Sequence, residues 1–265
     1  MDLIILATIL ISGTVFGSFF TLAVHRIPRK ENITYVRSYC PNCNHKLFGF
    51  DLIPVLSYIF LGGKCRYCKN KIRPRYLLLE IFSGLVFLLI ALSHNIGIES
   101  SLYELLNISF IYLFLCGVFI IGGIDKENFI IPNGLIIYEL VVGLAYIIFK
   151  LVNKISVYSN IVGLIAIPLL FTIINLVTKK IIKNENNLPF GMGDIKYIAV
   201  IGLFLGFSGQ IVSLILATFI TLIYLIIKKI KQIPFGYYLS IATTIAIILI
   251  PRMTNVMEVL EFMIV

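Results

Sequence analysis

The chain has 265 residues, of which 59% are hydrophobic and only 13% are charged, and its mean hydropathy is +1.01. This composition excludes an ordinary soluble domain and indicates a chain embedded mostly in a lipid bilayer, with room for one small soluble insert. The net charge of +9 would favour a nucleic-acid partner in a soluble protein, whereas in a membrane protein it more often reflects basic cytoplasmic loops. We therefore expect the bilayer as a partner and no nucleic acid.

Eight apolar runs predict about eight membrane-spanning helices and an all-α polytopic fold. The sixth run is short and the seventh follows almost at once through GFSGQ, so these two are expected to form a tight hairpin. The chain then divides into a first helix (1–24), a soluble insert (25–76) and a membrane core (77–265). The predicted spans are 3–24, 77–92, 105–123, 134–149, 156–177, 197–207, 211–227 and 234–250.

The distribution of basic residues predicts the orientation of the chain in the membrane. The first run is followed by Arg26, Arg29 and Lys30, which places the N-terminus outside and the insert in the cytoplasm. With this orientation, the cytoplasmic segments hold 19 of the 22 lysines and arginines. These segments are 25–76, 124–133, 178–196 and 228–233.

The insert contains two pairs of cysteines, Cys40 with Cys43 in CPNC and Cys65 with Cys68 in CRYC. Four thiolates from two such turns complete a tetrahedral zinc site, which leaves no open position for catalysis and therefore predicts a structural zinc ion in a ribbon-like insert. The gap of twenty-one residues between the pairs is slightly longer than the usual spacing. Disulfides, a redox dithiol and uncoordinated thiols are the alternatives, and a reducing cytoplasm argues against disulfides.

Carboxylates are scarce in this chain, and four of them lie near or within predicted spans: Glu80, Asp125, Glu139 and Asp194. A charged group at the middle of a bilayer costs about 2.5–3.5 kcal/mol on insertion scales, so each of them requires an explanation. Glu80 and Glu139 fit structural roles near the cytoplasmic start of their helices. Asp125, in GGIDKENFIIPN, and Asp194, in GMGDIK, both lie next to glycines, which permit close approach of a second backbone.

Two aspartates from different helices can form a catalytic pair that shares one proton, with one carboxyl group acting as base and the other as acid. Such a pair activates water against a peptide carbonyl without a metal ion or a covalent intermediate. A second interpretation stays open at this point, in which Asp125 and Asp194 are interfacial residues paired with the neighbouring Lys126 and Lys196. Spacing alone does not show whether the two aspartates meet.

Several motifs in one order resemble the type IV prepilin peptidases, which are membrane aspartyl proteases of the GxGD type. GSFFTLAVHRIPRKENI (17–33) is similar to the opening segment of that family, and the four-cysteine insert resembles its counterpart. IDKENFIIPN (124–133) and GMGDIK (191–196) resemble the two aspartate motifs, and IPFGYYLS (233–240) resembles the segment before the last helix. Each motif is short, but the whole set in this order is highly specific. Tyr237 departs from the pattern, because proline is expected there.

The resemblance implies that Asp125 and Asp194 are catalytic and lie at the cytoplasmic face of a bacterial inner (plasma) membrane. Gly191 and Gly193 are expected to let the helix end and the substrate backbone come close, and Lys196 is expected to hold one aspartate in its ionised form. The implied substrates are pilin-like precursors with a short basic leader and a hydrophobic helix. The leader would be cut on the cytoplasmic side, just after a glycine.

The family is often bifunctional and also methylates the new N-terminal amine with S-adenosylmethionine. Composition and periodicity reveal no methyl-donor site, so the resemblance alone implies this activity, through the cysteine insert and Glu31. Glu31 is also compatible with a solvated loop charge among arginines. A peptidase without the methylase activity is one alternative. A zinc-ribbon-capped transporter, whose intramembrane carboxylates carry protons or ions, is another, but it leaves the IPN and GxGD segments unexplained.

Overall fold

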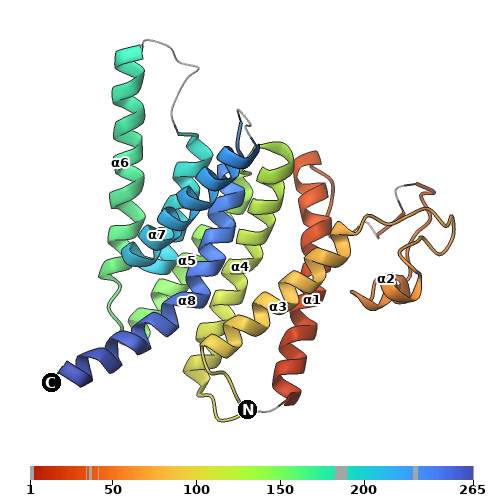
Figure 1. Cartoon of the computed structure of the whole chain (residues 1–265), viewed down its shortest axis with the longest axis horizontal. Coiled ribbons are helices and arrows are strands. Elements are labelled where there is room, and N and C mark those ends of the chain that lie inside the picture. The colour runs from red at the N-terminus through yellow and green to blue at the C-terminus, as the bar shows by residue number, and fades with distance from the viewer. Residues whose placement is uncertain are drawn as a thin grey trace. The chain divides into compact units, whose positions relative to one another are not determined.

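The computed structural model describes residues 3–33, 35, 38–40, 42–182, 190–228 and 232–264, with side chains up to residue 251 in the last range. Most of these residues form helices joined by loops (Figure 1). Among the described residues, β-pairing is limited to two isolated bridges within the insert. The chain divides into two compact units, residues 1–108 and 109–265. The all-α fold class predicted from the sequence is confirmed.

The first unit is built on two apolar helices, α1 (Leu3–Arg26) and α3 (Arg75–Ser93). Small residues allow these helices to touch: a Cβ atom at Gly13 would lie 2.8 Å from the Cα of Gly84. The hydroxyl of Ser83 donates a hydrogen bond to the carbonyl of Gly13 at 2.8 Å, which satisfies a polar group inside the helix pair. The insert between them contains the short helices η1 (Ile27–Arg29), η2 (Gly49–Asp51) and α2 (Leu56–Phe60).

The second unit is a helical bundle with an apolar core. Phe114 stacks on Phe204 with ring centroids 4.1 Å apart. Two backbones approach each other closely at Gly163 and Gly202, because a Cβ atom at Gly163 would lie 2.7 Å from the carbonyl oxygen of Gly202. Only residues without side chains allow such a crossing. The helices are α4 (Leu102–Asn128), α5 (Asn133–Val152), α6 (Tyr158–Ile182), α7 (Met192–Lys228) and α8 (Phe235–Ile264).

Helix α7 reverses its direction at Gly206, whose φ of 77° and ψ of 175° are not helical. In a straight helix, Ile198 and Gln210 would lie about 18 Å apart along the axis. Instead, the side-chain amide of Gln210 donates to the carbonyl of Ile198 at 2.8 Å. The chain therefore folds back, with a glycine at the one position that needs a positive φ. This is the hairpin that the sequence predicts around GFSGQ.

The first residues of α6 satisfy the backbone groups that this reversal leaves without helical partners. The amide of Asn160 donates to the carbonyls of Leu203 at 2.8 Å and Phe204 at 3.0 Å. The hydroxyl oxygen of Ser159 accepts the N–H of Phe207 at 3.0 Å. Such replacement is needed because a bilayer core provides no water for unpaired backbone groups.

Within the described residues, six helices are long and apolar enough to cross a membrane: α1, α3, α4, α5, α6 and α7. The hairpin divides α7 into two segments, and α8 contributes a shorter apolar stretch, Phe235–Pro251, so the eight predicted runs all correspond to helical segments. The predicted boundaries differ by a few residues at most helix ends, and two of these differences concern the aspartates. Helix α4 continues to Asn128 and α7 begins at Met192, so both aspartates lie inside helix ends and not in the adjoining loops.

Candidate active site and metal centre

Asp125 lies in the last turn of α4 and is 5% exposed. The N-terminus of α8 faces it: the backbone N–H of Tyr237 donates to Oδ2 of Asp125 at 3.0 Å. The first N–H groups of a helix have no intrahelical acceptor and favour a negative charge. A Cβ atom at Gly236 would lie 3.0 Å from the same oxygen, so the close approach depends on glycine.

Asp194 lies in the first turn of α7 and is half-buried. Its carboxyl group folds back over the start of its own helix, because a Cβ atom at Gly191 would lie 2.8 Å from Oδ2 of Asp194. A Cβ atom at Gly193 would lie 3.2 Å from Cβ of Ile131, in the segment between α4 and α5. Both glycines of the GMGD motif therefore provide room, one for the aspartate itself and one for a neighbouring chain segment.

The two aspartates meet in one region of the second unit. The side chain of Ile131 lies beside Gly193 at the start of α7 and beside Gly236 at the start of α8. A Cβ atom at Gly236 would lie 3.0 Å from its Cδ1. The charge of Asp125 also acts directly on the carboxyl group of Asp194. The end of α4, the start of α7 and the start of α8 thus bring together two acidic groups that are distant in sequence. A pair that shares one proton needs two acidic groups in one such region.

The lysines that follow the aspartates have other partners. Nζ of Lys126 donates to the hydroxyl of Tyr237 at 3.1 Å and lies 4.5 Å from the centre of its ring. Nζ of Lys196 donates to Oδ1 of Asn133, the first residue of α5, at 2.9 Å. Lys196 therefore ties α7 to α5, and its predicted effect on an aspartate stays a prediction.

Sequence reasoning missed Asn175, which holds the segment that leads into GMGD. Its amide donates to the carbonyl of Phe190 at 2.9 Å, and its Oδ1 accepts the N–H of Phe190 at 3.2 Å. The ring of Phe190 also stacks on Phe171 at 4.4 Å between centroids. An asparagine in the apolar run of α6 was the available signal, because polar groups at membrane depth require a partner.

Tyr197 and Ser240 form a second support that sequence reasoning missed. Tyr197 is fully buried, and its hydroxyl lies 2.8 Å from that of Ser240. Ser240 in turn donates to the carbonyl of Gly236 at 2.8 Å. This contact ties the first turns of α7 to the end of α8 that faces Asp125. No sequence pattern distinguishes Tyr197 from the other aromatic residues of the apolar runs.

The other two intramembrane carboxylates have separate surroundings. Oε2 of Glu80 accepts the backbone N–H of Val55, in the insert, at 2.8 Å. Glu139 is fully buried in α5 and packs against Gly117 of α4. The structural roles expected for both residues stay predictions.

The four cysteines of the insert form one cluster, in which all sulfur atoms lie within 4.8 Å of one another. The sulfurs of Cys40 and Cys68 are 3.8 Å apart and the thiols are free. Four thiolates at about 2.3 Å from a central ion would be separated by about 3.8 Å. The cluster could therefore hold one metal ion, and four sulfur ligands would leave no open position.

The two cysteine turns have the same backbone structure. The carbonyl of Cys40 accepts the N–H of Asn44 at 2.8 Å, and that of Cys65 accepts the N–H of Lys69 at 3.0 Å. Asn44 and Lys69 both have a positive φ, of 55° and 57°. One isolated bridge closes each turn, Tyr39 with Lys46 and Lys64 with Lys71. The repeated geometry presents two thiols from each side to the same centre.

The thiols of the cluster share negative charge unevenly. The backbone N–H of Asn70 and further hydrogen bonds lower the pKa of Cys68 to about 6. The N–H of His45 acts to lower the pKa of Cys43, but burial and the neighbouring thiols of Cys68 and Cys40 raise it to about 11. A metal ion is the charge that allows all four sulfurs to ionise together.

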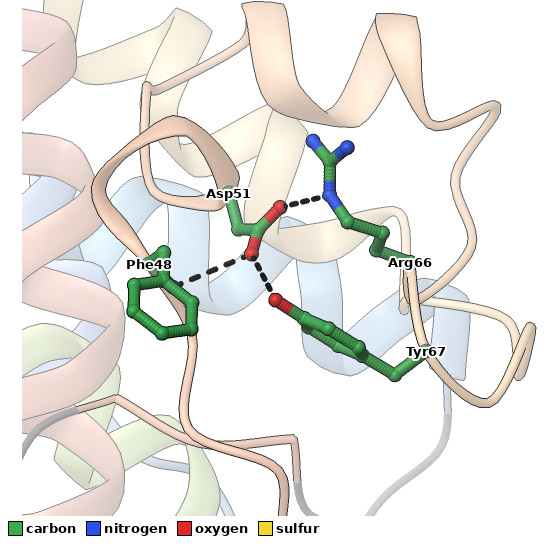
Figure 2. A network of polar contacts seen from close by, with 4 residues as sticks. All are labelled: Phe48, Asp51, Arg66 and Tyr67. Atoms are coloured by element: carbon green, nitrogen blue, oxygen red, sulfur yellow. Dashed lines mark hydrogen bonds and ion pairs between the residues drawn. The ribbon is translucent and has the colours of Figure 1, made fainter.

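Asp51 joins the segment between the cysteine pairs to the second turn (Figure 2). Its carboxylate accepts hydrogen bonds from Nε of Arg66 at 2.6 Å, from the hydroxyl of Tyr67 at 3.4 Å and from the N–H of Phe48 at 3.3 Å. Burial acts to raise the pKa of Asp51, but the hydrogen bond from Arg66 and the other donors outweigh it and hold the pKa below its ordinary value. Arg66 and Tyr67 stand between Cys65 and Cys68, so this network positions two metal-ligand candidates.

Glu31 is exposed at the start of the insert, where its N–H donates to the carbonyl of Arg26 at 3.1 Å. Ile33, two residues further on, lines a cavity of about 470 Å³. The lining residues are Leu22, Ile33, Ser38, Leu47, Phe48, Gly49 and Leu52. Glu31 is not among these lining residues, and its role in methylation stays a prediction.

Two family models match most of the chain. Residues 11–94 match the bacterial peptidase A24 N-terminal domain, and residues 112–226 match the type IV leader peptidase family. No solved structure matches the chain.

Curated relatives with the same printed name match over most of their length. The prepilin leader peptidase/N-methyltransferase of Vibrio cholerae is 31% identical over 215 residues, which cover 78% of this chain and 79% of that protein. The protein of the same name from Pseudomonas aeruginosa is 27% identical over 276 residues, 92% of this chain and 90% of that protein. The protein of the same name from Klebsiella pneumoniae is 29% identical over 214 residues, which cover 78% of this chain and 88% of that protein.

We expect Asp51→Asn to loosen the insert, because the variant loses the charged acceptor of Arg66. The measurement is the rate of limited proteolysis of the insert in the detergent-solubilised protein. The lowered pKa keeps Asp51 ionised over about pH 5–8, and its contribution is lost only when the pH falls through that lowered pKa. The difference from wild type should therefore be constant across this window.

Tyr67→Phe is the matched control, because it removes only the longer hydrogen bond to Asp51 and should have a smaller effect. An unchanged proteolysis rate for Asp51→Asn would contradict the positioning role of this network. A difference that appears only at the upper end of the pH window would contradict the lowered pKa.

Proposed function

This chain belongs to the type IV leader peptidase family, and on that premise we propose that Asp125 and Asp194 cut the leader from pilin-like precursors. The observation that carries this proposal is the convergence of both aspartates with the N-terminus of α8. The relatives' printed names also support a second activity, N-methylation of the new N-terminus.

In the proposed reaction the two carboxyl groups share one proton. One carboxylate removes a proton from a water molecule, whose oxygen attacks the scissile carbonyl carbon, while the other carboxyl group protonates the carbonyl oxygen. The N–H of Tyr237 supports negative charge on Asp125, so we assign the base role to Asp125 and the acid role to Asp194. The same pair then passes a proton to the departing amine, and the C–N bond breaks.

The proposed substrates are type IV pilin-like precursors with a short basic leader and a hydrophobic helix. The bilayer would hold the helix beside the second unit, and the leader would be cut just after a glycine on the cytoplasmic side. Two features support this location in the inner (plasma) membrane. Most lysines and arginines fall in the segments predicted to be cytoplasmic, and both aspartates lie at helix ends that border two of these segments. The proposed orientation has the N-terminus outside.

For the methylation step we propose S-adenosylmethionine, which supplies a methyl group to the new amine when it is bound. The cavity beside Ile33 suits such a ligand, because small-molecule sites of about 300–1,000 Å³ are mostly apolar with a few polar groups. Ser38 and the backbone of Gly49 would be those groups. Glu31 does not line the cavity, and its proposed part in methylation rests on the resemblance alone. These residues lie in the insert and not beside the two aspartates in sequence.

We propose that the ion of the cysteine cluster is a structural zinc. The sulfur spacing, the repeated turns and the ligand set of four thiolates support zinc over harder cations, which prefer oxygen ligands. With no open position, this zinc would hold the insert together and take no part in peptide hydrolysis.

We expect Asp125→Asn and Asp194→Asn each to abolish cleavage of a synthetic precursor by the detergent-solubilised protein, while the protein still folds. Each change removes one carboxyl group that the shared proton needs. Glu99→Gln is the control, because Glu99 is exposed in the loop after α3. Normal turnover by Asp194→Asn would refute the assignment, and a transporter would leave precursor maturation intact in all three variants.

We expect Tyr237→Pro to lower cleavage only modestly, by about threefold at most, because it removes one N–H that donates to Asp125 but also restores the proline that the family pattern has at this position. Proline is tolerated in the first turn of a helix, so α8 should be kept. Activity should not vanish, since the N–H of Gly236 also acts on this carboxylate. Initial rates of precursor cleavage give the comparison.

Tyr237→Phe is the matched control for this experiment. It keeps the backbone donor and loses only the hydroxyl that accepts from Lys126, so its rate should stay near that of wild type. The opposite pattern, with a normal proline variant and an impaired phenylalanine variant, would assign the role to the side chain and not to the N–H.

We expect elemental analysis of the purified protein to find about one zinc ion per chain. Cys65→Ser should lose this ion, whereas Cys116→Ser, in α4, should keep it. Methylation should fall more than cleavage in Cys65→Ser, because both aspartates belong to the second unit. Metal-free protein with two disulfides would overturn both the zinc assignment and the cytoplasmic placement.

A further inference from the structure

One stretch of the insert, FGFDLIPVLSYIF (48–60), exposes an apolar face outside the predicted membrane spans. Phe50 is 80% exposed and Phe60 is 83% exposed. A soluble surface rarely presents so many large apolar side chains in one short segment, so this face requires a covering partner. The exposed residues that line no cavity are Phe50, Ile53, Leu56, Ile59 and Phe60; Phe48 and Leu52 are also exposed but line the cavity beside Ile33.

The single charged residue of this segment, Asp51, does not belong to the exposed apolar face. Asp51 is 4% exposed at its side chain and accepts hydrogen bonds from Arg66 and Tyr67 (Figure 2). Its charge is therefore compensated within the insert. What remains for an outside partner is an uncharged surface rich in phenylalanine, leucine and isoleucine.

The segment is tied to a membrane-spanning helix. The N–H of Val55 donates to Oε2 of Glu80 at 2.8 Å, and Glu80 belongs to α3. Glu80 lies five residues after the start of α3 at Arg75, or about 8 Å along the helix axis. This distance is comparable with the depth at which interfacial segments lie in a bilayer. Val55 has a φ of 63°, an unfavourable value for a β-branched residue, so this contact is held against backbone strain.

The surroundings of the segment fit the boundary between headgroups and acyl chains. The first turns of α3 expose Leu78, Leu79 and Phe82, so the apolar surface has a lipid-facing neighbour. Basic residues stand on both sides in sequence, where they can meet anionic headgroups at about 1 kcal/mol for each residue near the surface. They are Lys46, Lys64, Lys71, Arg73 and Arg75.

We propose that residues 48–60 lie in the interfacial layer of an anionic phospholipid bilayer and hold the cysteine cluster against the membrane surface. Phe50 and Phe60 enter the boundary of the acyl chains, and the flanking lysines and arginines contact lipid phosphates. The segment has thirteen residues, too few to span the bilayer but suited to lie along it. This inference does not depend on the proposed peptidase activity.

The chain has no tryptophan, so one introduced tryptophan reports its own surroundings. Phe60→Trp would be reconstituted in vesicles of phosphatidylglycerol and phosphatidylcholine with bromine atoms near the top of the acyl chains. We expect blue-shifted emission, strong quenching by the brominated lipid and weak quenching by aqueous acrylamide. Tyr35→Trp is the control in the same insert, because Tyr35 is 89% exposed outside this segment, and it should show the reverse pattern.

Aqueous quenching of Phe60→Trp equal to that of Tyr35→Trp would overturn the proposal. Emission that is shielded from acrylamide but insensitive to brominated lipid would also overturn it, since a protein contact would then cover the face. Phe50→Trp gives a second, independent reading from the same surface. Strong quenching that weakens when phosphatidylglycerol is replaced by phosphatidylcholine would support the predicted contribution of the basic residues.

Discussion

The contact between Asp125 and the first N–H groups of α8 is the constraint on which the second unit depends. A nearly buried carboxylate inside a membrane bundle is costly without donors, and the first N–H groups of a helix lack acceptors. Each satisfies the other at a hydrogen-bond distance of 3.0 Å. The contact requires α8 to approach α4 very closely, which explains why Gly236 faces Asp125 and why Gly122 faces Ser240. The glycines are thus consequences of one polar interaction.

The two aspartates are placed at opposite kinds of helix end, and this has an electrostatic consequence. Asp194 lies at the N-terminus of α7, where the helix dipole favours a negative charge, whereas Asp125 lies at the C-terminus of α4, where it does not. The N-terminus of α8 compensates for this unfavourable position. The reversal at Gly206 limits the first part of α7 to residues 192–205, about 21 Å, which is shorter than the hydrocarbon core of about 30 Å. Because this segment does not reach both membrane surfaces, the depth of the start of α7 in the bilayer is not fixed by the length of a full span.

The sequence predicted the helices, the hairpin and the cysteine cluster, because these features depend on local spacing. Apolar runs are long enough to recognise, and a pair of cysteines with two residues between them forms a turn by itself. It did not show that Asp125 and Asp194 meet, since their meeting depends on how three helix ends pack. The supports at Asn175 and Tyr197 were missed for the same reason, as their partners Phe190 and Ser240 lie on other segments. Several predicted helices also ended too early or began too late, because polar residues near a membrane interface resemble loop residues in a sequence.

Four carboxylates at membrane depth share residue chemistry but differ in their partners, and the partners separate their roles. Glu80 accepts a backbone N–H from the insert, which makes it a tether between a span and the interfacial segment. Glu139 is fully buried against Gly117, which leaves it no access to a substrate. Asp125 is held by a helix N-terminus, and Asp194 remains half-buried over its own glycine. Among these four, Asp125 and Asp194 lie within electrostatic reach of each other, and two carboxyl groups so placed are what acid–base hydrolysis by a pair needs. In such a bundle, the partner of each acidic group therefore indicates its role, and a catalytic role is indicated where two acidic groups lie close to each other.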